Sequence, residues 1–333
     1  MGLDGRPFWY GGLLNIFNTS EGLKLRPNHD WWNLAEATSR FQEFYVRMTS
    51  RREGGIVSLF FHPAEFIHNE FWDAVNFARG ANPPREEWKV PPMKTPDESA
   101  RAFKYFEDLV TYMKSFPRLQ FVTASQAFEL FRDAAQRRAY SADDLLDIAK
   151  QVGPDVSFQV HDEYELAASE VFLLLNRYVE NMARKAARPP LLLDGTPYGP
   201  GSPGTQLNST IEVPWTQFSR TVLDVADFLA KRDQLPNAVW LGSHPVPPES
   251  YLLALSQVTM RLIIKGGPPD FVSVAPARLT AAQHVAEDSP GLWDWVILPP
   301  GFRAPNLMAL AKLQAWTLKP ARLHPPTLTR ISR

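Results

Sequence analysis

The segment GGIVSLFFHPAEF, Gly54 to Phe66, decides the expected fold. Ile56 to Phe61 form a β-branched and aromatic run behind two glycines, which is typical of a strand buried on both faces in a parallel sheet. The run stops at His62-Pro63, because proline lacks an amide donor and favours an extended residue before it. Active sites of α/β folds lie at the carboxyl ends of such strands, so His62 and Glu65 are candidate catalytic residues. A histidine that caps the strand and bonds to nearby backbone is the alternative.

Length and composition limit the classes of protein to consider. The 333 residues allow two domains, and 44% hydrophobic with 21% charged residues indicates a globular chain. A net charge of −1 without a basic stripe gives no sign of a nucleic-acid partner. No apolar run approaches the ~20 residues of a membrane span, and Met1 to Tyr10 lacks the features of a signal peptide. The absence of cysteine excludes disulfides and thiolate metal sites and leaves the compartment open.

The first half alternates between strand and helix patterns, which predicts an α/β fold with a parallel sheet. Pro7 to Phe17 is expected to form a strand or a hairpin that bends at Gly11-Gly12. Apolar spacing predicts helices over 33–48, 98–114 and 125–132, and a short strand over 119–122. The segment 66–92 is too irregular for one element and is expected to be a long, aromatic-rich excursion.

The second half contains an internal repeat. An offset of 79 aligns Ser169–Pro190 with Pro248–Pro269 without a gap. Helices over 142–152 and 215–231 and short strands over 156–160 and 238–241 precede the two copies. A less regular third copy is expected over 280–286 (helix), 293–298 (strand) and 305–318 (helix). Such units predict one compact domain built by duplication. Gly195 to Gly204 is expected to be a flexible loop between copies, and no Lys-Ser/Thr follows it as in a phosphate loop.

Three segments carry a resemblance to a known family. SLFFHPAEF, FWDAVNFARGANPP and FVTASQAFEL, within roughly residues 1–135, resemble the closing portion of polysaccharide deacetylases of the NodB-homology family. The resemblance implies part of a distorted (β/α)7 barrel over residues 1–138. It also implies removal of acetyl groups from sugar polymers with a divalent metal, zinc being expected. By this resemblance His62 would be the general acid that protonates the leaving group, with Glu65 beside it.

The sequence departs from this family in its metal site. The Asp-Asp pair and the His-x-x-x-His segment that supply the ligands and base in the family do not occur here. Three protein ligands and an open position are needed for a hydrolytic metal centre. His62, Glu65, His68 and Glu70 are close in sequence, but their spacing has no periodicity that would bring them together. We therefore expect no metal bound by this chain, and no activity unless an upstream half completes the barrel.

Candidate substrate-binding residues follow from the same segments. Aromatic faces suit the apolar faces of pyranose rings, which makes Trp9, Tyr10, Phe71 and Trp72 candidates for stacking on sugar. Phe61, Arg79 and Asn82 complete the expected substrate-binding set. Ordinary core and loop packing is the alternative for each aromatic residue.

The unit TVLDVADFLAKRDQLPNAVWLGSHPVPPESYLLALSQV, residues 221–258, resembles the pseudomurein-binding repeat. The match is best at Leu235-Pro236-Asn237 and Tyr251. It implies that residues 139–333 form a mostly helical repeat domain with short strands that attaches to cell-wall polymer. A duplicated helical domain without wall contact is the alternative.

Together these observations predict a carbohydrate-active, deacetylase-like protein that is incomplete and inactive alone, with polysaccharide or wall glycan as partner. A non-catalytic glycan-binding or wall-binding module is one alternative. A glycosidase on a related barrel is another, with Glu65 and Glu70 as candidate carboxylates.

Overall fold

The computed structural model describes Leu3 and residues 6–18, 33–51, 54–186 and 190–324, which belong to two compact units. Unit 1 comprises Met1–Asn15, Arg132–Glu287 and Pro305–Arg322, and unit 2 comprises Ile16–Phe131, Asp288–Ala304 and Leu323–Arg333. Both units are discontinuous in sequence, so they do not test the expected division between residues 138 and 139.

The fold is mixed α/β with short strands, which confirms the class predicted from the sequence. The largest sheet has three strands in the order β13-β1-β2, and the other named strands form two-stranded pairs. These short sheets form no closed barrel in the described parts of the chain. The partial (β/α)7 barrel stays a prediction.

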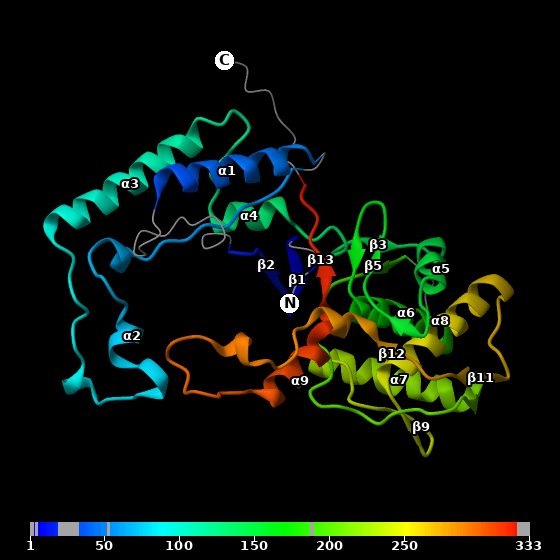
Figure 1. Ribbon diagram of the computed structural model, residues 1–333. Coiled ribbons are helices and arrows are strands. Elements are labelled where there is room, and N and C mark those ends of the chain that lie inside the picture. The colour runs from blue at the N-terminus through cyan, green and yellow to red at the C-terminus, as the bar shows by residue number, and fades with distance from the viewer. Residues whose placement is uncertain (1–2, 4–5, 19–32, 52–53, 187–189, 325–333) are drawn as a thin grey trace. The chain divides into compact units, whose positions relative to one another are not determined.

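Unit 2 is built on two helices that the apolar spacing predicted, α1 (Leu34–Thr49) and α3 (Pro96–Lys114). They lie side by side (Figure 1) around a core of Ala37, Phe41, Phe44, Leu109 and Met113. The Asn33 side chain accepts hydrogen bonds from two amides of the first turn of α1, and Thr95 forms a capping box with Glu98 at α3. Caps and apolar stripes together explain why both helices form here.

The run Ile56 to Phe61 is not the buried strand that its composition predicted. Among the described residues, its ladder contact is an isolated parallel bridge between Ser58 and Asn18. Val57, Leu59 and Phe61 pack on the α1–α3 core, whereas Phe60 is 38% exposed. Within the described residues the segment is extended and packs Val57, Leu59 and Phe61 against helices, while Ile56 and Ser58 are half-buried. The predicted strand over 119–122 is also wrong, because these residues form no strand.

The rest of unit 2 consists of short helical turns. The excursion over 66–92 is confirmed as irregular, and the helix expected over 125–132 is confirmed as α4. The strand expected over 293–298 is wrong: this segment is a turn whose Val296 and Ile297 carbonyls accept hydrogen bonds from the Arg79 and Gly80 amides. The elements are η1 (Pro63–Phe66), α2 (Trp72–Asn76), η2 (Ala78–Gly80), η3 (Arg85–Glu87), α4 (Ala124–Leu130) and η5 (Pro290–Trp293).

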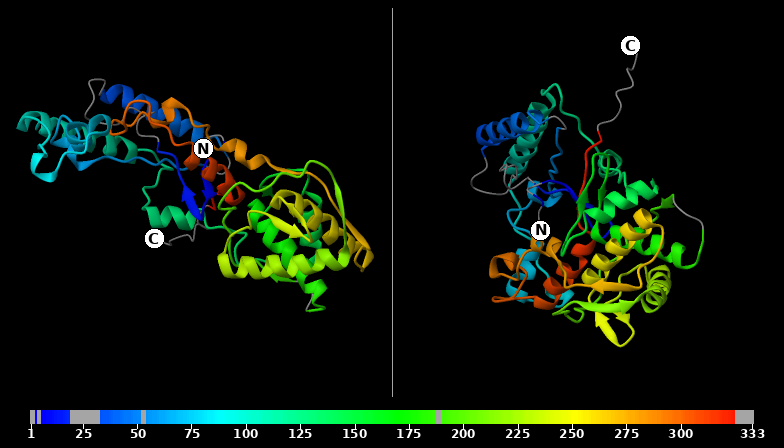
Figure 2. Two further views of the ribbon diagram at one scale, coloured as in Figure 1. Left: turned by 90° about the horizontal axis from the view of Figure 1, so that it is seen from below. Right: turned by 90° about the vertical axis from the view of Figure 1, so that its right-hand side faces the viewer.

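Unit 1 has a helical core. α5 (Ala142–Lys150), α6 (Ala168–Ala183), α7 (Trp215–Arg232) and α8 (Pro248–Lys265) confirm the helices expected there. In both views of Figure 2 the green α6, yellow-green α7 and yellow α8 stay together. α6 and α8 carry few charged residues, and both helices are accordingly buried along most of their length. η4 (Thr280–His284), α9 (Pro305–Gln314) and η6 (Ala315–Thr317) complete the helical elements.

The strands of unit 1 are two to four residues long. β1 and β2 confirm the predicted hairpin, and the bend has positive φ angles at Gly11 and Gly12. β4 and β12 pair in parallel, and the other pairs are antiparallel. The strands are β1 (Phe8–Tyr10), β2 (Leu13–Asn15), β3 (Ala139–Tyr140), β4 (Asp155–Val156), β5 (Gln159–Val160), β6 (Glu165–Leu166), β7 (Leu191–Leu192), β8 (Ile211–Pro214), β9 (Val239–Leu241), β10 (His244–Val246), β11 (Phe271–Val274), β12 (Arg278–Leu279) and β13 (Lys319–Pro320).

The two aligned copies of the repeat contain equivalent elements. α6 follows β6, and α8 follows β10. Phe172 and Tyr251, which the offset of 79 makes equivalent, are both fully buried, and their ring centroids are 5.5 Å apart. This pairing is compatible with duplication, which stays a prediction.

Candidate functional site

The predicted catalytic residues lie on a 3-10 turn. His62 precedes η1 and is exposed, and its imidazole meets the edges of Phe60 and Phe71 with centroid distances of 5.0 and 5.2 Å. Glu65 is only 1% exposed, and its amide donates to the His62 carbonyl at 2.9 Å. The turn thus exposes the imidazole and buries the carboxyl group. The catalytic roles of both residues stay predictions, but His62 does not end a buried strand.

The four acidic and histidine residues near this turn do not fit a metal site. Glu70 is exposed, whereas the His68 Nδ1 lies 3.2 Å from the Pro91 carbonyl oxygen. Within the ranges that the structure describes, no group of three His, Asp or Glu side chains could hold an ion.

Unit 2 instead presents a set of aromatic rings that we call the tryptophan surface: the exposed Trp72, Trp88 and Trp295 and the half-buried Phe77. Trp72 and Trp88 are 41% and 44% exposed and meet edge to face at 6.4 Å. Phe77 meets Trp88 at 5.4 Å. The Trp295 indole is 61% exposed, and its Nε1 donates to Asp73 Oδ2 at 3.0 Å. Large exposed rings gathered in this way mark a binding surface more often than a chance arrangement.

Buried polar contacts hold the tryptophan surface in place. Asn76 is 6% exposed, and its Nδ2 donates to the carbonyls of Trp72 at 3.2 Å and Lys89 at 2.9 Å. The Lys89 amide returns a hydrogen bond to Asn76 Oδ1 at 2.7 Å. The Trp88 Nε1 donates to the Pro83 carbonyl at 3.1 Å. Asn76 therefore joins α2 to the proline-rich segment that carries Trp88. The sequence prediction included Trp72 but missed Trp88, Trp295 and this asparagine.

The expected substrate-binding residues are divided between the units. Trp9 is 8% exposed in unit 1, and the half-buried Tyr10 donates its hydroxyl to the Ala311 carbonyl at 2.7 Å. Burial raises the pKa of Tyr10 to about 12. These two rings fit the alternative of ordinary packing. In unit 2, Phe61 packs against Phe106 with a centroid distance of 4.8 Å.

The remaining members of the expected set lie on the aromatic excursion. Trp72, Arg79 and Asn82 are all exposed there. Arg79 has a φ of 57°, a conformation that β-branched and bulky residues seldom adopt. These three residues lie in one segment, with Trp72 as the member that belongs to the tryptophan surface.

Unit 1 contains a groove of about 450 Å³ between α6, α7 and the segment 194–197. Its volume lies in the range of small-molecule sites. The lining residues combine apolar, acidic and basic side chains: Leu173, Asn176, Arg177, Glu180, Arg184, Asp194, Gly195, Pro197, Ala226, Asp227, Leu229, Ala230 and Asp233.

The loop 195–204 contributes Gly195 and Pro197 to the lining of this groove and makes several hydrogen bonds, and the flexibility expected of it stays a prediction. Asn237 Oδ1 accepts hydrogen bonds from the amides of Gly201 at 2.9 Å and Ser202 at 3.2 Å. Gln234 Nε2 donates to the Gly199 carbonyl at 3.0 Å. A Cβ at Gly199 would lie 2.1 Å from a backbone oxygen, so only glycine permits this approach. The Leu-Pro-Asn turn thus positions the loop through Asn237.

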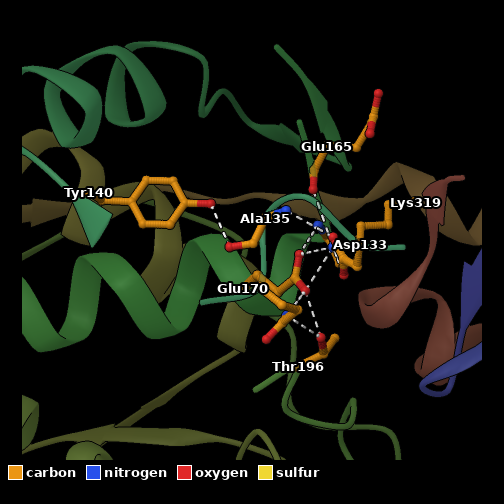
Figure 3. A network of polar contacts seen from close by, with 9 residues as sticks. Asp133, Ala135, Tyr140, Glu165, Glu170, Thr196 and Lys319 are labelled. Atoms are coloured by element: carbon orange, nitrogen blue, oxygen red, sulfur yellow. Dashed lines mark hydrogen bonds and ion pairs between the residues drawn. The ribbon is translucent and has the colours of Figure 1, made fainter. Parts of the chain in front are cut away.

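A buried ionic network lies near the start of α6 (Figure 3). Lys319 Nζ contacts Asp133 Oδ2 at 2.6 Å and both Glu170 oxygens at 2.8 and 2.9 Å, and it donates to the Glu165 carbonyl at 3.2 Å. Glu170 also accepts hydrogen bonds from Gln136 Nε2 at 2.7 Å and the Thr196 hydroxyl at 2.6 Å. The Lys319 ammonium group thus has a carboxylate or carbonyl acceptor for each of its N–H groups, as a buried charge requires.

The electrostatics of this network indicate a structural role. Burial lowers the pKa of the Lys319 ammonium, but the charges and hydrogen bonds of Glu170 and Asp133 outweigh it and raise the pKa. A lysine that acts as a nucleophile needs a lowered pKa and a free amine. Lys319 therefore stays charged and joins β13 to α6. Sequence reasoning did not identify it, because a lone lysine in TLKPARLH has no pattern that signals burial.

Comparison with protein-family models, with curated proteins and with solved structures found no match for this chain. Among the described helices, none combines the length and apolar character needed to cross a membrane.

Proposed function

We propose that this chain is a carbohydrate-active protein that binds glycan on the tryptophan surface of unit 2. The observation that carries the proposal is the pair of exposed indoles, Trp72 and Trp88, held by Asn76 and the Pro83 carbonyl. A fixed aromatic face presents apolar area at low entropic cost. Pyranose rings offer a matching face of C–H groups, so indoles are suited to stack on them.

Polar groups on the segment that carries Trp72 and Trp88 support the same proposal. Asp73 is held by the Trp295 indole, and Arg79 and Asn82 are exposed on the same excursion. Carboxylate, guanidinium and amide groups supply the donors and acceptors that sugar hydroxyls need. We further propose that residues 1–138 correspond to the closing part of a deacetylase-type (β/α)7 barrel, and that the repeats of residues 139–333 contact cell-wall polymer.

Sedimentation with insoluble polysaccharides tests glycan binding. The complete chain is mixed with chitin, cellulose or a cell-wall preparation, and the pellet is assayed for protein. We expect co-sedimentation with at least one polymer and release by soluble oligosaccharides of the same sugar. A chain that stays in the supernatant with all three polymers would contradict the proposal.

Deacetylation in a completed protein is a second candidate, favoured by the exposed His62 imidazole between Phe60 and Phe71. His62 would protonate the leaving group, which requires an accessible imidazole. The Asp-Asp pair and the His-x-x-x-His segment that hold the metal in that family do not occur in this sequence. We expect no acetate release by residues 1–333 with added divalent metals, and metal-dependent release by this chain alone would contradict that expectation.

Glu65 is buried and Glu70 is exposed, so no observation favours the glycosidase alternative.

A further inference from the structure

The groove between α6 and α7 has a fixed floor and a fixed wall. Its floor includes Asn176, which is fully buried; its Nδ2 donates to the Val222 carbonyl at 3.2 Å, and its Oδ1 accepts from the Tyr251 hydroxyl at 2.7 Å. The wall is anchored by Thr196, which stands between the lining residues Gly195 and Pro197 and donates its hydroxyl to Glu170. A ligand that enters the groove therefore meets preorganised groups, which lowers the entropic cost of binding.

Most charged side chains around the groove neutralise one another. Arg177 Nη1 lies 2.6 Å from Asp194 Oδ1, and Arg184 Nε lies 3.0 Å from Glu180 Oε1. The Asp227 carboxylate is paired at 2.5 Å with Lys231, which lies outside the lining. Asp233 is different: within the described residues, its carboxylate accepts no hydrogen bond and has no cation within ion-pair distance.

The position of Asp233 is electrostatically unfavourable for an anion. It ends α7 in a left-handed conformation, with a φ of 48°. The carbonyl end of a helix carries partial negative charge and favours cations. Asp233 is exposed to solvent, and partial desolvation together with the charge of Asp194 raises the pKa of its carboxyl group. A bound cation would offset the charge of Asp194 and the partial negative charge of the helix end.

We propose that the α6–α7 groove binds an amino sugar with a free ammonium group, which pairs with Asp233. The ammonium supplies three N–H donors to a site that is rich in carboxylate acceptors. The Arg177–Asp194 pair offers both donors and acceptors to the ring hydroxyls. That the ligand is a sugar rests on the proposed function. That the ligand is a cation rests on the side chains that line the groove. This site lies on unit 1 and is separate from the tryptophan surface of unit 2.

Isothermal titration of the complete chain tests the site. The probes are a glucosamine trisaccharide and the N-acetylglucosamine trisaccharide, which has the same ring but no charge on nitrogen. A solvent-accessible ion pair is worth up to about 1 kcal/mol, so we expect the amine to bind about fivefold more tightly than its acetylated counterpart. Equal affinities would overturn the proposal. Butylamine that binds as tightly as the amino sugar would overturn its assignment to a sugar.

Three variants test whether Asp233 in the groove causes the preference for the amine probe. Asp233→Asn should abolish the amine preference, whereas Asp224→Asn, an exposed position on the same helix outside the groove, should keep it. Ala230→Leu narrows the groove without changing its charge and should weaken binding of the amino sugar. An unchanged amine preference in Asp233→Asn would overturn the proposal.

A fourth variant separates this site from the tryptophan surface. The double variant Trp72→Ala/Trp88→Ala should keep the amine preference, because it leaves unit 1 unchanged. If the double variant binds the acetylated probe more weakly, that result would show binding at the tryptophan surface and would not test the groove. If the double variant loses the amine preference and Asp233→Asn does not, the ammonium binds on unit 2 and the groove assignment is overturned.

Discussion

Lys319 and Glu170 form an ion pair of 2.8 Å although 149 positions separate them in the chain. The side chains are 2% and 0% exposed, so neither charge is solvated by bulk water. Asp133, at 2.6 Å from the same ammonium group, adds a second carboxylate. The pair joins the C-terminal strand of unit 1 to the first turn of its central helix.

Lys319→Met should destabilise the protein by about 3–5 kcal/mol, because it leaves the Glu170 carboxylate buried without its cation. Urea denaturation measures the free energy of unfolding. Lys312→Met is the matched control: Lys312 pairs with Glu287 at 2.5 Å, but the side chains are 34% and 82% exposed. The control should cost no more than about 1 kcal/mol. Equal costs for the two variants would show that the buried network is not stabilised by its cation.

Tyr251→Ala should cost about 3–5 kcal/mol, as large core truncations do. Its ring is fully buried between Phe172 and Phe218, at centroid distances of 5.5 Å from each. Tyr251→Phe keeps the ring but removes the hydrogen bond to Asn176 Oδ1, so it should cost about 1–3 kcal/mol. The exposed change Gln257→Ala should lie within about 0.5 kcal/mol of the parent. A phenylalanine variant as stable as the parent would show that the buried hydroxyl contributes nothing.

Ionisation of Tyr10 should contribute to the fall in the unfolding free energy of unit 1 at alkaline pH. Burial raises its folded-state pKa from 10.0 to about 12, so folding favours the neutral phenol. This contribution is fully present below pH 10 and is lost as the pH rises toward 12. Tyr10→Phe should therefore make the fall of the unfolding free energy across this window less steep. Tyr198→Phe, at a position 47% exposed, should change the slope less. A slope unaffected by Tyr10→Phe would contradict this account.

Local patterns predicted the helices well. α1 and α3 have apolar residues at helical spacing, and both begin at side-chain caps that are visible in the sequence. The Gly11-Gly12 hairpin was predicted for a similar reason, since positive φ is a local property of glycine. In each case the residues that fix the element are near one another in the chain.

Features that depend on distant partners were predicted poorly. The composition of Ile56 to Phe61 suits a strand, but Val57, Leu59 and Phe61 pack on the core of α1 and α3, and the segment forms no strand. Its wrong assignment also misplaced His62. The tryptophan surface needs Asp73 to meet Trp295, which is 222 positions away, and no pattern in either segment signals this contact. The Lys319 network is hidden for the same reason.

Retention of the chain on a glycan matrix tests the central claim most directly. The parent, Trp72→Ala/Trp88→Ala and Trp240→Ala are compared in affinity electrophoresis with the polysaccharide that sediments the parent. Trp240 is 60% exposed on β9 of unit 1. Trp240→Ala is therefore the control, because it removes an exposed indole outside the tryptophan surface. Loss of both indoles removes the apolar area that the sugar rings would cover, so the double variant should lose about tenfold in affinity, which corresponds to about 1.4 kcal/mol. Unchanged retention of the double variant, or an equal loss in Trp240→Ala, would contradict glycan binding at the tryptophan surface.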